Sequence, residues 1–318
     1  MKKYRGKVGI LLMAVLLAAT TVTGYAVEKS EQTATANENV MNATKPYQNH
    51  IRFEHLGLNC VDQIVTADWY MKYMGLVELW QKDNRRVIYI GDSDGNFALE
   101  LYAKEAKDKL SNLNTDAFHI AFEGNNIEAL AKKMIEGGAV QIGKTITNAI
   151  GDVVIDIADP WGNKLQLVHR KEPFFTKPVK SSLRFEHIGL NVENQMITAL
   201  WYCEFMGLSI PFSKDPTGPN KSSNYRAPYV GDPSGHMSLE LYSKPKAAVG
   251  NYGALDTTVS HLAFAVNDAA AVAAKMVKGG ATQLAAPISN SVGDVVIDLR
   301  DPWGINIQLV QRKAPFLK

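Results

Sequence analysis

The sequence contains one long segment twice, and this duplication constrains the fold more than any other feature. The stretch Arg52-Phe-Glu-His-Leu-Gly-Leu-Asn59 returns as Arg184-Phe-Glu-His-Ile-Gly-Leu-Asn191. The hexapeptide Gly151-Asp-Val-Val-Ile-Asp156 returns unchanged as Gly293–Asp298. Two copies of one folding unit, joined by a linker, are therefore expected.

Within each copy, the hydrophobic pattern predicts two successive units, each with one strand, one helix and three further strands. In the first unit, apolar residues alternate along 52–60 and recur with helical spacing along 61–74. Gly75 follows that segment and suits a left-handed helix cap. The second unit covers 118–169, where Asp159-Pro160-Trp161-Gly162 has the composition of a type I turn.

The repeated stretch at 52–59 reads as a strand that carries a histidine. Successive side chains of a strand point to opposite faces. Strict alternation places Phe53, His55, Gly57 and Asn59 on one face, and Glu54, Leu56 and Leu58 on the other. The histidine is therefore expected opposite two leucines.

Each copy places four polar residues on four predicted strands, always opposite the large aliphatic side chains. The two sets are His55, Glu100, His119 and Gln166 in the first copy, and His187, Glu240, His261 and Gln308 in the second. Two imidazoles, a carboxylate and an amide oxygen suit a divalent metal such as Zn, Ni, Mn or Fe(II). The other interpretation is a set of polar residues on a water-facing sheet.

Composition excludes several classes of protein. The formal net charge is +2 and the basic residues are scattered, which gives no electrostatic case for nucleic acid. The sequence has no phosphate-binding glycine loop, no Gly-x-Ser-x-Gly elbow and no Cys-x-x-Cys pair. Its two cysteines, Cys60 and Cys203, occupy non-equivalent places in the two copies, which favours buried free thiols over a disulfide.

The N-terminal segment has the pattern of an export signal. A basic start is followed by an apolar run over 8–22 and by small residues up to Ala26. Residues 1–26 are predicted to be a signal peptide and 27–50 a flexible tether, with an uncleaved anchor as the alternative. No later stretch is long and apolar enough for a membrane helix. A periplasmic or secreted protein without membrane contact after cleavage is expected.

The order and spacing of these motifs resemble the vicinal oxygen chelate superfamily. The resemblance rests on FEHLGLN, LELY, FHIAF and DPWGNKLQLV and covers about Ile51–Arg312. That superfamily includes glyoxalase I, bleomycin-resistance proteins and extradiol dioxygenases. The resemblance implies an α+β fold in which four tandem βαβββ units form two glyoxalase-like domains with cupped mixed sheets. The expected boundaries are domain 1 at 51–171, a linker at 172–182, domain 2 at 183–313 and a tail at 314–318.

The resemblance also implies that the eight polar residues are metal ligands. Each set either closes within its own copy or is exchanged between copies. In the exchanged, glyoxalase-like arrangement, His55 and Glu100 meet His261 and Gln308, while His187 and Glu240 meet His119 and Gln166. The departure from the family pattern is Gln instead of Glu on the last strand. An amide oxygen can coordinate a metal but cannot take a proton, so Glu100 and Glu240 must act as ligand, as base, or as both.

These features predict an exported, divalent-metal-dependent enzyme acting on a small molecule with two vicinal oxygens. Lyase or isomerase chemistry through an enediolate-like intermediate is the first expectation. The alternatives are a ring-cleaving extradiol-type dioxygenase and a non-catalytic protein that sequesters a small molecule, as bleomycin-resistance proteins do. Asp156 and Asp298 are expected to support turns. An eight-residue insertion within 213–228 is either a lid or a loop that tolerates extra length.

Overall fold

The computed structural model describes residues 51–103, 118–148, 151–172, 182–210, 228–232, 235–252, 257, 260–314 and 317. All of these lie in one compact unit, Gln48–Lys318. The predicted signal peptide and tether, most of the linker, and the insertion up to residue 227 fall outside the described residues. Among the described helices, none is long and apolar enough to cross a membrane.

The two copies fold into similar but not identical successions of elements, and the predicted α+β class is confirmed. The first copy comprises β1 (Ile51–Asn59), α2 (Gln63–Trp69), η1 (Tyr70–Met74), β2 (Val77–Lys82), β3 (Val87–Gly91), β4 (Ala98–Tyr102), β5 (Phe118–Gly124), α3 (Ile127–Glu136), β6 (Val140–Thr147), β7 (Val153–Ala158) and β8 (Lys164–His169). The second comprises β9 (Leu183–Val192), α4 (Gln195–Trp201), η4 (Tyr202–Met206), β10 (Tyr229–Gly231), β11 (Ser238–Ser243), η5 (Lys246–Ala248), β12 (Ser260–Val266), α5 (Ala269–Lys278), β13 (Thr282–Gln283), β14 (Ile288–Ser289), β15 (Val295–Arg300) and β16 (Asn306–Gln311).

The first helix shows how local sequence sets these boundaries. Asp62 caps its start, because its carboxylate accepts hydrogen bonds from the backbone N–H groups of Ile64 and Val65. The helix therefore starts at residue 63 and not at the predicted residue 61. Its last turn is the π-helix η1, which ends at Gly75 with φ of +79°, the predicted left-handed cap.

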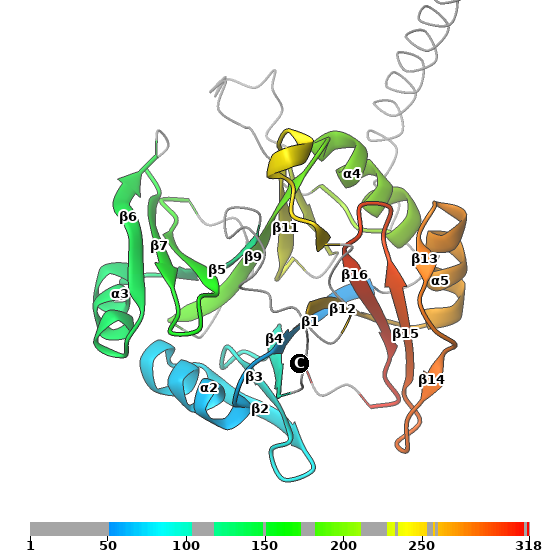
Figure 1. Ribbon diagram of the computed structural model, residues 1–318, viewed down its shortest axis with the longest axis horizontal. Coiled ribbons are helices and arrows are strands. Elements are labelled where there is room, and N and C mark those ends of the chain that lie inside the picture. The colour runs from blue at the N-terminus through cyan, green and yellow to red at the C-terminus, as the bar shows by residue number, and fades with distance from the viewer. Residues whose placement is uncertain are drawn as a thin grey trace, which may run out of the picture. The chain divides into compact units, whose positions relative to one another are not determined.

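Each of the two sheets takes strands from both copies. One sheet has the order β13-β15-β16-β12-β1-β4-β3-β2, with β14 also paired to β15. The other has the order β10-β11-β9-β5-β8-β7-β6. The junctions are the antiparallel pairs β1–β12 and β5–β9, visible in Figure 1. The first strand of each copy thus pairs with a strand from the middle of the other copy, which brings their histidines into adjacent strands.

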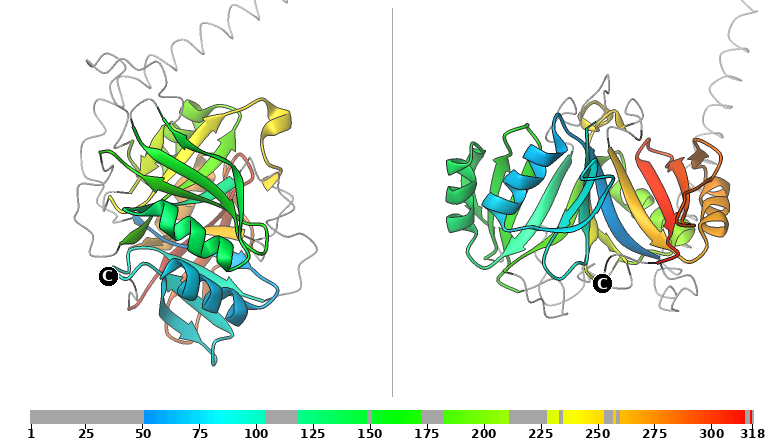
Figure 2. Two further views of the ribbon diagram at one scale, coloured as in Figure 1. Left: turned by 90° about the vertical axis from the view of Figure 1, so that its left-hand side faces the viewer. Right: turned by 90° about the horizontal axis from the view of Figure 1, so that it is seen from below.

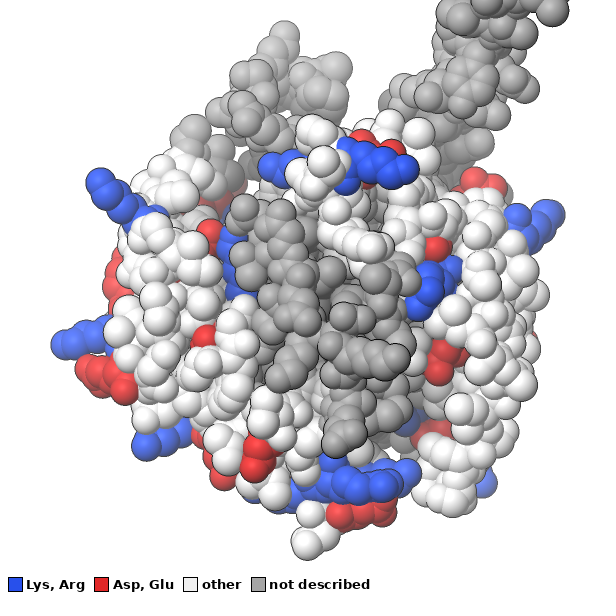
Figure 3. Space-filling view, in the orientation of Figure 1, with Lys and Arg blue, Asp and Glu red and all other residues white. Residues whose placement is uncertain are grey.

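The helices cover the outer faces of the sheets, as the views in Figure 2 show. α2 packs on β3 and β4, α3 on β7 and β8, α4 on β11, and α5 on β15 and β16. The large aliphatic residues of the strands, such as Leu99 and Leu167, are buried beneath these helices. On the face seen in Figure 3, basic and acidic side chains lie close to one another around the rim. The opposite faces of the central strands carry the predicted polar residues.

A β-bulge in the first strand of each copy overturns part of the predicted alternation. Phe53 pairs with Phe264, but His55 pairs with the next residue, Ala263, so Glu54 is an extra residue in β1. Phe53 consequently packs into the core, where its ring centroid lies 4.6 Å from that of Phe264. Glu54 reaches the side chain of His55 instead of joining the leucines. The same irregularity occurs in β9, where the pairing with β5 passes from Phe185 to His187 and leaves Glu186 as the extra residue.

Both cysteines are free thiols, as predicted, and both are partly buried. They pack against the hydrophobic core. Burial raises the pKa of Cys60 to about 11 and that of Cys203 to about 12. Neither thiol has the lowered pKa of a reactive cysteine.

Candidate metal centres

The first candidate centre is formed by His55, Glu100 and His261 on three adjacent strands. β1 lies between β4 and β12, so one side chain from each strand meets on the shared face. The two imidazole Nε2 atoms are 3.2 Å apart. Oε2 of Glu100 lies 3.3 Å from Nε2 of His55 and 3.1 Å from Nε2 of His261. Three potential ligand atoms thus converge on one point.

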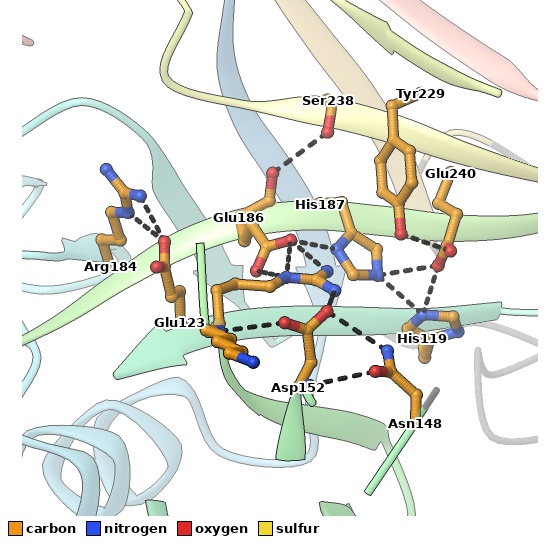
Figure 4. Close-up of polar contacts among 12 residues, drawn as sticks. His119, Glu123, Asn148, Asp152, Arg184, Glu186, His187, Tyr229, Ser238 and Glu240 are labelled. Atoms are coloured by element: carbon orange, nitrogen blue, oxygen red, sulfur yellow. Dashed lines mark hydrogen bonds and ion pairs between the residues drawn. The ribbon is translucent and has the colours of Figure 1, made fainter. Parts of the chain in front are cut away.

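The second candidate centre repeats this arrangement with His119, His187 and Glu240. The two Nε2 atoms are 3.1 Å apart, and Oε2 of Glu240 lies 2.9 Å from His187 and 3.7 Å from His119. Figure 4 shows the two imidazoles and the carboxylate pointing toward one another. All three side chains are buried. The two centres are therefore near-equivalent products of the duplication.

Six of the eight sequence-predicted site residues come together, and they do so in the exchanged arrangement. His55 and Glu100 of the first copy meet His261 of the second, and the converse holds for His187, Glu240 and His119. The two glutamines lie on the same faces, one strand farther out. Gln308 pairs with Ala263, which in turn pairs with His55, and Gln166 is related to His187 through Ala121 in the same way.

The spacing of the ligand atoms fits a divalent metal ion. Ligands about 2.0–2.2 Å from a metal are roughly 3.3–3.6 Å apart in tetrahedral geometry and about 2.8–3.1 Å apart in octahedral geometry. The observed separations of 2.9–3.7 Å span these values. Two imidazoles and one carboxylate suit Zn, Ni, Mn or Fe(II). The donor set and its spacing therefore match the predicted cofactor class.

Each histidine of β1 and β9 is oriented by a carboxylate that strict alternation had placed on the other face. Nδ1 of His55 lies 3.2 Å from Oε1 of Glu54, and Nδ1 of His187 lies 3.3 Å from Oε1 of Glu186. Nδ1 of His261 lies 2.9 Å from the backbone oxygen of Thr257. Because these partners only accept hydrogen bonds, each Nδ1 carries the proton. The Nε2 atoms then face the clusters, an orientation typical of metal-bound histidine.

An arginine holds each of these carboxylates, and Arg170 is buried while Arg312 is partly buried. Nε of Arg312 donates to Glu54 at 3.0 Å, and its Nη1 donates to Asp294 at 2.9 Å. Arg170 contacts Glu186 and Asp152 in the same way. The repeated hexapeptide supplies both aspartates, and each arginine stands just after the last strand of its copy. That repetition was the only sequence signal for this network.

A tyrosine holds the outer oxygen of each cluster glutamate. The hydroxyl of Tyr89 on β3 donates to Oε1 of Glu100, and the hydroxyl of Tyr229 on β10 donates to Oε1 of Glu240. Oε2 of each glutamate is left facing the histidines. Sequence reasoning missed both tyrosines, although they occupy equivalent positions in the two copies.

Asp156 and Asp298 lie within strands and not in turns, which corrects the expectation for them. Each stands directly across from a glutamine, in the pairs Asp156–Gln166 and Asp298–Gln308. The amide nitrogen of each glutamine donates to its aspartate at 3.1 Å. This hydrogen bond fixes the amide nitrogen and directs the amide oxygen away from the aspartate.

Local charges separate the proton affinities of the cluster groups. Burial opposes protonation of His55 and His187, but the neighbouring glutamates outweigh it and raise the pKa of each to about 9. Burial lowers the pKa of His119. The histidines hold the pKa of Glu100 and Glu240 well below the usual range, against the opposing effect of burial. A metal ion must displace these protons, so metal affinity should rise with pH.

Comparisons with known proteins agree with this architecture. The family model described as the Glyoxalase/Bleomycin resistance protein/Dioxygenase superfamily matches residues 52–167 and 184–309. Glyoxalase I from Zea mays matches with a TM-score of 0.62 and 20% identity, covering 83% of this chain and 93% of that chain. A mutant of that enzyme matches with a TM-score of 0.64 and 20% identity, covering 86% of this chain and 96% of that chain.

A proposed dioxygenase from Bacillus subtilis matches with a TM-score of 0.55 and 14% identity, covering 83% of this chain and 86% of that chain. No protein of curated function matches the chain significantly. At these identities the structural likeness shows the fold alone.

Proposed function

The chain belongs to the Glyoxalase/Bleomycin resistance protein/Dioxygenase superfamily, and from that premise we propose that it is a divalent-metal-dependent enzyme. Its substrate is a small molecule with two neighbouring oxygen atoms. The observation that carries the proposal is the pair of equivalent clusters, each with two histidine nitrogens and one glutamate oxygen converging on a point. A divalent ion held there would polarise the two substrate oxygens as a Lewis acid.

The side chains around each cluster have distinct roles in this proposal. The Nε2 atoms of the histidines and Oε2 of the glutamate would hold the ion. Glu54 and Glu186 fix the orientation of His55 and His187, because each accepts the Nδ1 proton. The glutamines at 166 and 308 offer an amide oxygen on the same face and stay neutral throughout.

We propose lyase or isomerase chemistry, in which a proton leaves a carbon next to a carbonyl group. Glu100 and Glu240 supply the carboxylate of each cluster, so Oε2 would serve in turn as ligand and as base, taking and returning this proton while it is not bound to the ion. Tyr89 and Tyr229 keep donating to Oε1 and hold the carboxylate plane during the transfer. The buried surroundings of Glu240 strengthen its interaction with developing charge.

A second candidate, a ring-cleaving dioxygenase, is favoured by one observation. Two histidines and one carboxylate form the ligand set that non-haem Fe(II) oxygenases use. The cluster of His55, Glu100 and His261 has this composition, although the glutamate comes from β4 and not from the last strand. This candidate requires Fe(II) and oxygen uptake with a catechol.

The experiment that tests the proposal is metal analysis followed by substrate screening. Protein without a histidine tag is analysed by plasma mass spectrometry, then reloaded with Zn, Ni, Mn or Fe(II). About two equivalents per chain, with turnover of α-hydroxycarbonyl compounds without oxygen, are expected. Oxygen consumption with a catechol would support the dioxygenase. Ligand binding without metal would instead indicate a sequestering protein.

We also propose that the protein is exported after removal of residues 1–26. The basic start, the apolar run over 8–22 and the small residues before position 27 support this. Intact-mass measurement of protein from the cell envelope or medium should show a chain that begins near Val27. A full-length mass in the cytosol would contradict export.

A further inference from the structure

We call the sheet face that carries each centre its cup. The cup of the second centre contains a cation, Lys164, beside the β5 histidine His119. Lys164 begins β8, which runs parallel to β5 with Leu165 opposite Ile120. Lys164 therefore lies next to His119 on the same face, because both stand one residue before this pair. Its Nζ lies 3.5 Å from Oδ2 of Asp156, and its side chain is 14% exposed.

The cup of the first centre also contains a cation, but from a different strand. The position equivalent to Lys164 is occupied by the neutral Asn306. Arg300 on β15 stands directly across from Asn306 and donates from Nε to its Oδ1 at 3.1 Å. In the other copy, the residue across from Lys164 is Ala158. The side chain of Arg300 thus places a guanidinium group against Asn306, the residue that stands at the position of Lys164.

This replacement retains the charge of the cup although both positions differ between the copies. An arginine that crosses to the neighbouring strand compensates for the lysine that is absent. Residues that only face solvent would not need to retain a positive charge in this way.

The distance and the charge balance define what these cations can bind. Neighbouring strands are about 4.8 Å apart, and the lysine ammonium is held toward Asp156 on β7, so it lies more than one strand spacing from the cluster. That span matches a molecule of a few carbon atoms. With a divalent ion, one glutamate, one lysine and one aspartate, the second cup would carry a net charge of about +1, which favours an anion.

We propose, resting on the metal-dependent function above, that Lys164 and Arg300 bind a carboxylate group of the substrate. The vicinal oxygens of that substrate face the histidine–glutamate cluster, and the carboxylate lies at the other end. The substrate class is then a small oxo or hydroxy acid with an additional carboxylate. Arg300 can form two parallel hydrogen bonds to a carboxylate, whereas Lys164 offers a point charge.

The test compares two probes that differ only at the distal end. Metal-loaded full-length protein is titrated by calorimetry with 2-oxoglutarate and with 2-oxobutyrate, which share the 2-oxo acid group. We expect 2-oxoglutarate to bind at least 10-fold more tightly. The Lys164→Ala/Arg300→Ala variant should lose this preference while its affinity for 2-oxobutyrate changes less than about 2-fold.

A rescue variant gives the sharpest control. Adding Asn306→Lys to that double variant gives the first cup the lysine of the second, and should restore the preference for 2-oxoglutarate. Equal binding of both probes by the wild-type protein, or a preference that survives in the double variant, would overturn the carboxylate subsite while leaving the metal function standing. Failure to take up any metal would overturn both proposals.

Discussion

Gly57 lies directly beneath the imidazole ring of His261. A Cβ atom at Gly57 would stand 2.0 Å from Cε1 of that ring, a distance that no pair of non-bonded carbons can adopt. Gly57 pairs with His261 on one side and with Glu100 on the other. The missing side chain lets the ring lean across β1 toward Glu100 and His55. Gly189 stands in the same relation to His119.

Replacing Gly57 with alanine should therefore disable the first centre. The new methyl group would push the ring of His261 away from Glu100, and the cluster would lose one ligand. We expect the Gly57→Ala variant to bind one equivalent of metal normally and the other at least 10-fold more weakly. Competition with a chromophoric chelator measures both affinities.

The matched control is Gly124→Ala on β5. Its methyl group would meet Cδ1 of Leu183 and the backbone oxygen of Ser182 at 3.3 Å, a tight contact that small shifts can relieve. This variant should keep two equivalents of metal with unchanged affinity. Normal metal binding by Gly57→Ala would show that His261 is not a ligand.

The carboxylates behind the histidines should control metal affinity. In Glu186→Gln, Nδ1 of His187 loses its charged acceptor, and the second centre should bind metal 10–100-fold more weakly. Isothermal titration with Zn measures the change. The first centre, held by Glu54, should be unaffected.

Glu123→Gln is the control for that experiment. Glu123 forms a partly buried ion pair with Arg184 on the same two strands, but it does not contact the cluster (Figure 4). Both substitutions should lower the free energy of unfolding, by roughly 1–3 kcal/mol. Only Glu186→Gln should change metal affinity, and an equal effect of both would mean that Glu186 acts on stability alone.

Sequence periodicity predicted the faces of the eight polar residues because on each strand the large aliphatic residues alternate with the polar residue. It could not choose between closure within a copy and exchange, since the spacing along the chain is the same in both. The choice lies in the pairing of β1 with β12 and of β5 with β9, which depends on long-range packing.

The sequence pattern assigned Glu54 to the wrong face of β1, and the cause of this error is local. A bulge inserts one residue and reverses the alternation before it, and no glycine or proline marks the place. Its partner Arg312 lies 258 residues away along the chain. The exact repetition of the hexapeptide and of the arginine in both copies was the available signal that these residues cooperate.

The acid stability of the fold should depend on Asp301. Burial outweighs its hydrogen bonds from Tyr202 and the backbone and raises its pKa to about 6. Well below the unfolded pKa of 3.8, both the folded and the unfolded chain hold the proton, so this group gives the free energy of unfolding no pH dependence there. As the pH rises toward 6, the unfolded chain releases the proton first, and this group increasingly favours unfolding.

Asp301→Asn removes that titration and keeps one of the two accepting oxygens. Its free energy of unfolding, relative to the wild type, should rise by roughly 2–3 kcal/mol between pH 4 and pH 7. Urea denaturation at several pH values measures this difference. A difference that is independent of pH would mean that Asp301 ionises normally in the folded chain.

The central claim is that two metal centres are each built from both copies, and metal stoichiometry tests it most directly. Two double variants are reloaded with Zn and analysed by plasma mass spectrometry. In the exchanged arrangement, His55→Ala/His261→Ala disables one centre and should retain one equivalent per chain, while His55→Ala/His119→Ala disables both and should retain none. The reverse result, with none in the first variant and one in the second, would contradict the account.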